Sequence, residues 1–289
     1  MFQLAIQRLL TCATLAAALG MTVASFAAPS TPTPQALLEA MQQALIPSNA
    51  QFARVHISTH SDQPGGGTKT WDALVIRERD EQGPRTALSL VTPPVLNGAG
   101  MLTAPHPTKS MLGLWLYSPG ERRAIEVSPL DADRQFLTTQ FNFEDLAMTK
   151  RVYRRQVLLG SEHEGQRQAW KIESQPDVDR YYSRILTWIA ADTYLPIKRE
   201  YYDRADRLWK VVTYGERLIE NIPTVVSIEL RDVQSRDISE WKIEAVGYAH
   251  EKLAERVLSP AGLGVLQQHS VWQRIGANGK NNETVSRSK

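Results

Sequence analysis

The sequence has only one cysteine, Cys12, no strong excess of charge of one sign, and none of the motifs of common enzyme classes. Its 33 Lys and Arg residues nearly balance 31 Asp and Glu residues. This balance argues against a nucleic-acid-binding protein, which needs excess cations to displace phosphate counterions. No G-x-S-x-G, P-loop, H-E-x-x-H or dinucleotide-binding motif is present. We therefore expect neither an enzyme nor a protein that needs a cofactor.

Residues 1–27 are typical of a secretory signal peptide. Arg8 is their only charge, an apolar run extends from Leu9 to Val23, and Ser25-Phe26-Ala27 suits cleavage after Ala27. The alternative is a permanent anchor helix, but the run of roughly 15 residues is shorter than the ~20 needed to span a bilayer. Cys12 lies inside this run, so the mature chain has no thiol. We expect an exported, periplasmic protein.

After a short leader (28–33), the pattern predicts one helix and then many strands. Thr33 suits the N-cap and Pro34 the first turn of a helix that stops at Pro47. Alternation of period two then indicates about twelve strands, at 55–60, 70–78, 86–92, 111–117, 122–128, 151–160, 168–174, 183–191, 196–203, 207–214, 224–233 and 238–247. So large an antiparallel sheet must curl, split or close. We expect a mainly β fold with a curled sheet, the helix over its mouth, and a disordered polar tail at 277–289.

Two strands allow a prediction of which face each side chain occupies. Because side chains alternate along a strand, Trp241, Ile243 and Ala245 should share one face, with Lys242 and Glu244 on the other. The segment 183–191 is apolar on both faces and should be covered on both.

We predict no metal site and no catalytic group. His56 and His60 form an H-x-x-x-H pair, but on a strand their rings would lie about 13 Å apart. Glu144 and Asp145 are adjacent carboxylates. They either point to opposite faces of a strand or favour the dipole of a short helix. A hydrolase that uses this pair is the weakest of the hypotheses we consider.

The segment 135–146, QFLTTQFNFEDL, resembles the S-D-F-x-Y-E-D-L signature of the LolA-like family of outer membrane lipoprotein-sorting proteins. Gln140 stands where the family has Asp, and Phe143 where it has Tyr. The segment 115–125, WLYSPGERRAI, is similar to the family's W-L-Y-x-P…R-R-I strand pair. Residues 188–210 are similar to its W-x-D…L-P…Y-D-x-x-G-x-L-x-K hairpin, with Asp206 in place of Gly. The likeness extends over most of 34–265, within a predicted domain at 34–276.

This resemblance implies an incomplete antiparallel barrel of about eleven strands, with helices plugging an apolar cavity. Because it would hold an acyl chain, we expect this cavity to lack charge. It implies a periplasmic carrier of a lipid or lipidated protein, acting beside an RND-type inner-membrane transporter or an outer-membrane acceptor. The residues expected to line the lipid site are Leu38, Met41, Leu45, Trp71, Trp115, Phe141, Phe143 and Trp188.

The alternative is a non-transporting sensor or accessory module of an envelope complex. Its contact residues would be exposed basic side chains, namely Arg122, Arg123, Arg151, Arg154 and Arg155.

Overall fold

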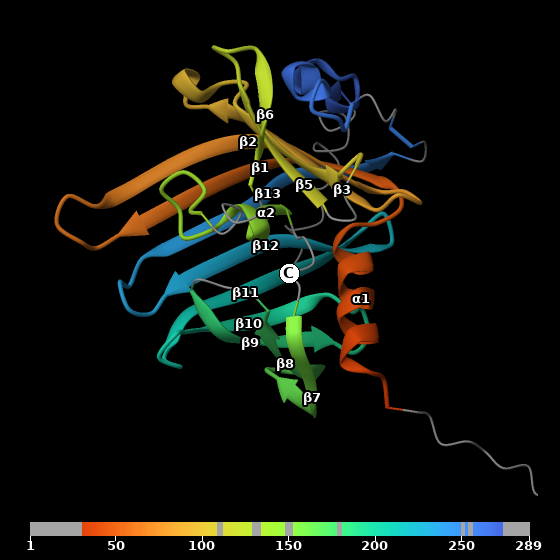
Figure 1. Ribbon diagram of the computed structural model, residues 1–289, viewed down its shortest axis with the longest axis vertical. Helices are drawn as coiled ribbons and strands as arrows, with labels where there is room; N and C mark the ends of the chain where they lie inside the picture. The colour runs from red at the N-terminus through yellow and green to blue at the C-terminus, as the bar shows by residue number, and fades with distance from the viewer. Residues whose placement is uncertain are drawn as a thin grey trace, which may run out of the picture. The chain divides into compact units, whose positions relative to one another are not determined.

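The computed structural model (Figure 1) describes residues 31–108, 112–128, 134–147, 153–177, 181–249, 252–253 and 257–273. The proposed signal peptide and the polar tail lie outside these ranges, so both stay predictions. The elements described below all belong to one compact unit, Thr33–Lys289. Within the described ranges, no helix has the length and apolar character needed to cross a membrane.

Helix α1 spans Pro34–Leu45, as the sequence predicts. Its N-cap is Thr33, whose Oγ1 accepts a 3.2 Å hydrogen bond from the backbone N of Ala36. This bond satisfies one of the free amides at the start of the helix. The helix buries a single apolar stripe, made of Leu37, Leu38, Met41 and Leu45.

The strands form one antiparallel sheet of 13 strands in the order β6-β5-β4-β3-β2-β1-β13-β12-β11-β10-β9-β8-β7. Two meanders thus meet where β1 pairs with β13, and β6 and β7 are the edges of a curled, unclosed sheet (Figure 1). The strands are β1 Ala50–Ser61, β2 Gly67–Arg79, β3 Pro84–Thr92, β4 Gly100–Pro105, β5 Leu112–Ser118, β6 Arg123–Val127, β7 Tyr153–Glu164, β8 Arg167–Pro176, β9 Tyr182–Ala190, β10 Pro196–Asp203, β11 Leu208–Ile219, β12 Ile222–Asp232 and β13 Ile238–Ala249.

The fold class agrees with the prediction, but the number of strands is larger than expected. The sequence analysis missed β4, Gly100–Pro105, which has only six residues, begins at a glycine and ends at a proline. Its central residues are buried throughout, so the strand has no alternation of polar and apolar side chains to reveal it.

Clusters of buried residues cover both faces of the sheet. We call inner the face covered by α1 and α2 (Phe143–Ala147), and outer the opposite face. The inner face carries the largest cluster. The outer face carries two smaller ones, of which one includes Leu263 and Leu266 of the 3-10 helix η3, Gly262–Gln268.

A β-bulge changes the alternation in β13. Val55 of β1 pairs with Ile243, whereas the preceding residue, Arg54, pairs with Ala245, which leaves Glu244 as an extra residue. Ile243 packs on the inner cluster and Ala245 on an outer one. The prediction that Ile243 and Ala245 share a face is therefore wrong, because a bulge places two consecutive side chains on one side of a strand.

Candidate functional site

The inner face carries one continuous apolar surface, and this surface is the candidate site. Its cluster of buried side chains runs from β5 to β8 across the strands between them. Helix α1 and the segment 136–146 supply the side chains that pack on it. In Figure 1, α1 lies beside the sheet and α2 in front of its middle.

Six of the eight residues predicted to line a lipid site meet in this cluster. Three come from α1, one from β2, one from the segment that leads into α2 and one from α2 itself, and they are Leu38, Met41, Leu45, Trp71, Phe141 and Phe143. Phe143 is half-buried and the other five are buried. The structure thus brings residues up to 105 positions apart in the sequence onto one surface.

The other two predicted residues lie on the outer face. Trp115 packs in an outer cluster, while its neighbour Leu114 joins the inner one. Trp188 packs with Leu186 in a third cluster, and its Nε1 donates a 2.6 Å hydrogen bond to Glu162 Oε1. Strand alternation therefore separates both tryptophans from the other six residues. It also confirms that β9 is covered on both faces.

The segment before α2 folds back on itself and presents two phenylalanines to the inner face. The backbone N of Phe136 donates to the carbonyl of Phe141 at 2.8 Å, and Thr139 Oγ1 donates to the carbonyl of Phe136 at 2.7 Å. The rings of Phe136 and Phe143 meet edge to face, with centroids 5.6 Å apart. This geometry is favourable for aromatic pairs. We call the segment 136–146 the plug.

Gln140 anchors this plug to the end of β13. Its backbone N donates to Ser239 Oγ at 2.8 Å, and its Nε2 donates to Asp237 Oδ2 at 3.1 Å. Its carbonyl accepts a bond from Lys210 Nζ at 3.1 Å. The LolA-like signature has Asp at this position, and a carboxylate here would face that of Asp237. The amide of Gln140 replaces that repulsion with a hydrogen bond.

Helix α2 begins with a capping box. The backbone N of Asp145 donates to Asn142 Oδ1 at 2.7 Å, and the backbone N of Asn142 donates to Asp145 Oδ2 at 3.0 Å. This reciprocal pair satisfies free amides at the helix start. Asp145 thus has a structural task, which favours the helical interpretation of the Glu144–Asp145 pair over the hydrolase hypothesis. The side chain of Glu144 lies outside the described residues.

Arg77 of β2 places a charge on the inner face. It is 2% exposed, and its Nη1 donates to Gln51 Oε1 at 3.3 Å. Its Nε and Nη2 are buried and have no hydrogen-bond partner among the described residues. Burial lowers the pKa of Arg77 to about 10, because water no longer stabilises the cation.

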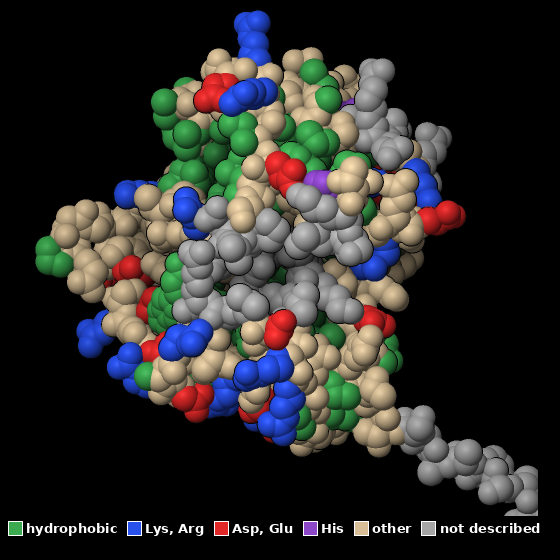
Figure 2. All heavy atoms as spheres, in the orientation of Figure 1, with side chains coloured by type: hydrophobic (Ala, Val, Ile, Leu, Met, Phe, Trp, Pro, Cys, Tyr) green, Lys and Arg blue, Asp and Glu red, His purple; other side chains and the backbone are tan. Residues whose placement is uncertain are grey.

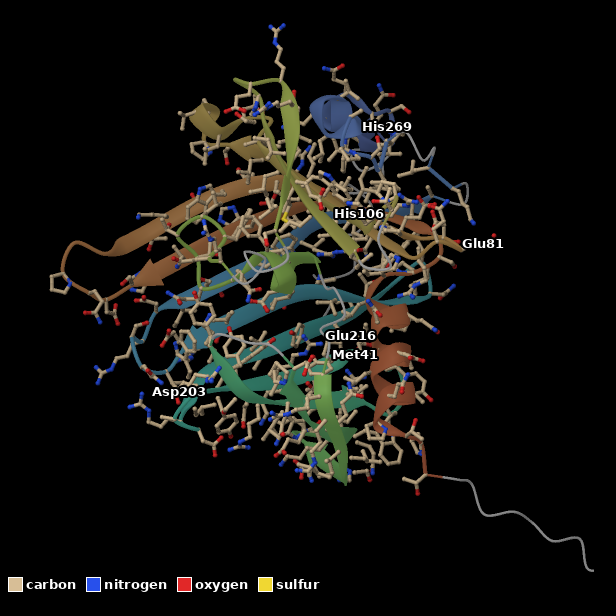
Figure 3. All side chains as sticks on the ribbon, viewed as in Figure 1. Met41, Glu81, His106, Asp203, Glu216 and His269 are labelled. Carbon is tan, nitrogen blue, oxygen red and sulfur yellow. The ribbon has the colours of Figure 1, made fainter. Side chains whose placement is uncertain are left out.

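Arg199 of β10 places a second cation there, against α1. Its Nη2 donates to the sulfur of Met41 at 3.5 Å, and Met41 is labelled in Figure 3. Its guanidinium carbon lies 6.0 Å from the ring centroid of Tyr214. Its Nε is buried and also has no hydrogen-bond partner within the described ranges.

The expectation that the apolar surface holds no charge is wrong at Arg77 and Arg199. A signal was present in the sequence, because Trp71, Ala73, Val75 and Arg77 follow one another at a spacing of two along β2. The period-two rule places all four on one face. The sequence analysis did not apply this rule to Arg77.

Two pockets are lined by described residues, and the second includes Trp209, which packs against the inner cluster. One, of about 320 Å³, is bordered by charged side chains that include Glu78, Asp80, Arg85 and Lys252. The other, of about 330 Å³, is bordered by Asp203, Arg204, Arg207 and Trp209, among others. Neither contains any of the eight predicted lipid-site residues.

Comparisons with solved structures support the LolA-like fold. A domain from Vibrio parahaemolyticus named for outer membrane lipoprotein sorting is 20% identical, with a TM-score of 0.67 and coverage of 78% of this chain and 97% of that one. A DUF1329 family protein from Desulfovibrio piger is 20% identical, with a TM-score of 0.66 and coverage of 81% and 100%. A LolA superfamily protein from Nitrosomonas europaea is 21% identical, with a TM-score of 0.60 and coverage of 79% and 98%.

Sequence comparison places the chain in a family. A model whose family is described as an uncharacterized protein family matches residues 83–264, more than half of the chain. No curated protein matches. The sheet, the plug and the LolA-like signature at 135–146 agree with this match. The chain belongs to this family, DUF1329, and has the fold of LolA-like lipoprotein-sorting proteins.

Proposed function

We propose that this protein is a periplasmic carrier that binds an acyl chain of a lipid or lipidated protein on the inner face of its sheet. The observation that carries the proposal is the apolar surface from β5 to β8, on which α1 and the plug around α2 pack. The names of the structural neighbours, which refer to lipoprotein sorting and to LolA, agree with this role.

The energy available from such a surface is large enough to carry an acyl chain through water. Burial of one methylene group contributes about 0.8 kcal/mol, so a chain of roughly fourteen contributes on the order of 11 kcal/mol. The loss of ligand freedom and the displacement of side chains subtract from this figure. Release then requires a competing apolar receptor rather than a chemical step. An RND-type inner-membrane transporter as donor, or an outer-membrane acceptor, would complete the pathway.

Ligand entry requires that α1 or the plug moves. Leu38, Met41 and Leu45 are each less than 9% exposed, because α1 packs directly on the sheet. An acyl chain therefore replaces contacts of α1 or of Phe143 rather than filling space beside them. Besides this packing, Arg79 donates to carbonyls at the C-terminal end of α1, and Arg199 contacts Met41.

The two inner arginines suggest where the polar end of the ligand lies. A buried cation without an anionic partner costs several kcal/mol, and an anion placed beside it recovers much of that cost. The Nε and Nη2 of Arg77, which have no hydrogen-bond partner among the described residues, would donate hydrogen bonds to the carboxylate or phosphate of an amphiphile. The proposed ligand is thus an anionic amphiphile, with its acyl chain along the face and its head toward Arg77.

The test is to identify what the protein carries after export. The full chain, expressed with its own N-terminus and purified from periplasm without detergent, is measured by native mass spectrometry and by displacement of a fluorescent fatty acid. We expect one acyl-chain ligand per protein. We also expect the mass of a mature chain that begins at Ala28. Absence of both co-purified lipid and displacement would contradict a carrier.

The same preparation tests the alternative of a non-transporting module. Pull-down from solubilised envelope would then recover a stoichiometric protein complex without lipid. One of the basic residues suggested as its contacts already has an ion-pair partner in the structure. Arg123 Nε lies 3.2 Å from Glu121 Oε2. Arg151 lies outside the described residues.

A further inference from the structure

The outer face brings together three potential metal ligands that are far apart in the sequence. His56 of β1 and Asp72 of β2 are directly opposite each other in the antiparallel pair, and His56 Nδ1 lies 2.8 Å from Asp72 Oδ1. Both side chains are about one-third exposed, at 37% and 36%. Solvent and ions therefore reach this pair.

The β-bulge in β13 adds the third group. Glu244 is the extra residue of the bulge, and β13 lies beside β1 on the side opposite β2. One ligand atom each from His56, Asp72 and Glu244 lies within 4.8 Å of the other two. Ligand atoms around a bound zinc ion are separated by about 3–3.5 Å, given bonds of roughly 2.0–2.2 Å. The exposed side chain of Glu244 can close this difference by rotation.

Asp72 is held in a conformation that suits ligation. Thr92 Oγ1 donates to Asp72 Oδ2 at 2.8 Å and accepts a 2.8 Å bond from the backbone N of Asp72. This contact fixes the carboxylate and leaves Oδ1 directed at His56, as in the supporting shells of known metal sites.

The charges nearby are compatible with a divalent cation. A neutral imidazole and two carboxylates carry a charge of −2. Lys242, which lies opposite His56, is engaged with Glu240, since its Nζ lies 3.0 Å from Glu240 Oε2. Arg54 interacts electrostatically with Asp72 and is the cation that competes with a metal.

We propose that His56, Asp72 and Glu244 form a binding site for a divalent transition-metal ion, with zinc preferred. Imidazole nitrogen combined with carboxylate oxygen suits zinc better than Mg²⁺ or Ca²⁺, which favour sites made only of oxygen. Three protein ligands leave at least one position open to water or to a group from a partner. The ion would join β2, β1 and β13, three adjacent strands of the sheet.

The experiment is zinc titration of the full chain, without a histidine tag, after treatment with EDTA and removal of the chelator. Isothermal titration calorimetry should show one zinc ion per chain, and Ca²⁺ or Mg²⁺ should not compete. Zinc should also raise the melting temperature, because it binds only the folded protein. Glu244→Gln and His56→Asn should each weaken zinc affinity at least tenfold, and the shift in melting temperature should disappear.

A matched control is present on the same strand. His60 contacts Asp62 at 2.8 Å, as His56 contacts Asp72, but no third ligand residue is grouped with this pair in the described chain. His60→Ala should therefore leave zinc affinity unchanged. Because the side chain of Glu244 is exposed, Glu244→Gln should have the circular dichroism spectrum of the wild type. Failure of the wild type to bind zinc, or equal affinity in Glu244→Gln and wild type, would overturn the proposal.

Discussion

Arg77 donates a hydrogen bond to Gln51, with 3.3 Å between Nη1 and Oε1, and this bond ties a buried cation to the strand that follows α1. Gln51 in turn donates to Tyr248 Oη at 2.9 Å, which lies 2.7 Å from Thr224 Oγ1. This buried polar chain ends at a guanidinium whose Nε and Nη2 have no hydrogen-bond partner among the described residues. Its carbon lies 5.6 Å from the ring centroid of Trp241. The proposed anionic ligand would neutralise this buried charge.

Replacement of Arg77 by methionine should stabilise the ligand-free protein. Removal of an uncompensated buried charge should raise the free energy of unfolding by about 1 kcal/mol or more. The same change should weaken binding of an anionic fatty acid at least tenfold, while a neutral alcohol of equal length binds as before. Urea unfolding and displacement fluorescence measure the two effects. If Arg77→Met binds both the fatty acid and the alcohol with wild-type affinity, Arg77 does not contact the ligand.

Arg79, two residues further along β2, is the matched control. Its Nη2 donates to the carbonyl of Gln42 at 2.8 Å and its Nε donates to that of Ile46 at 3.2 Å, so it satisfies carbonyls at the end of α1. Arg79→Met should lower the free energy of unfolding by about 1–3 kcal/mol, because it removes hydrogen bonds to a charged donor. In urea unfolding, Arg77→Met should raise the free energy of unfolding and Arg79→Met should lower it. Changes of the same sign in both variants would contradict the distinction between the two arginines.

Truncation of an aromatic ring on each face separates binding from stability. Phe143→Ala removes a ring from the inner face and Trp188→Ala one from the outer face, and both should lower the free energy of unfolding. Only Phe143→Ala should change the affinity for a fluorescent fatty acid, measured well below the melting temperature of both variants. Equal loss of affinity in both would indicate a site that is not restricted to the inner face.

The capping box of α2 should control how firmly the plug is held. Asn142→Ala removes the side-chain acceptor for the backbone N of Asp145, which should lower local stability by about 1 kcal/mol. Hydrogen–deuterium exchange should become faster at 136–146 and stay unchanged in β1. We also expect faster association of the fatty acid, because the plug opens more often. Unchanged exchange at 136–146 would contradict a stabilising role for this cap.

The turn between β10 and β11 should contribute to acid sensitivity. Hydrogen bonds from the backbone N and the guanidinium of Arg207 lower the pKa of Asp203 from 3.8 to about 2. Because the folded-state pKa is depressed, the stability from Asp203 is present above pH 4 and is lost as the pH falls toward 2. The difference in urea midpoint between wild type and Asp203→Asn should therefore narrow over this range. A constant difference from pH 5 to 2 would contradict this assignment.

Local rules predicted the parts of the structure that neighbouring residues determine. Thr33 and Pro34 start α1 where N-cap preferences place it. Asp206, which replaces the glycine of the LolA-like hairpin, has a φ of 59°, in the left-handed region that Asp tolerates better than most residues. The helical interpretation of Glu144–Asp145 is likewise confirmed by α2.

Pairing between distant strands determined what the sequence analysis missed. The bulge at Glu244 arises from the register between β1 and β13, which are almost 200 residues apart, and no pattern within β13 reveals it. Pairing of β1 with β2 and with β13 also places His56 close to Asp72 and Glu244, a grouping that its spacing from His60 does not reveal.

The sequence alone determined that this chain forms a curled antiparallel sheet led by one helix, because period-two alternation and helix caps depend on residues close together in the chain. Only the tertiary structure decided that Trp115 and Trp188 lie on the outer face and that Arg77 and Arg199 lie within the apolar inner face. Alternation places residues on one face or the other but does not state which face is inner. That choice depends on where α1 and the plug pack.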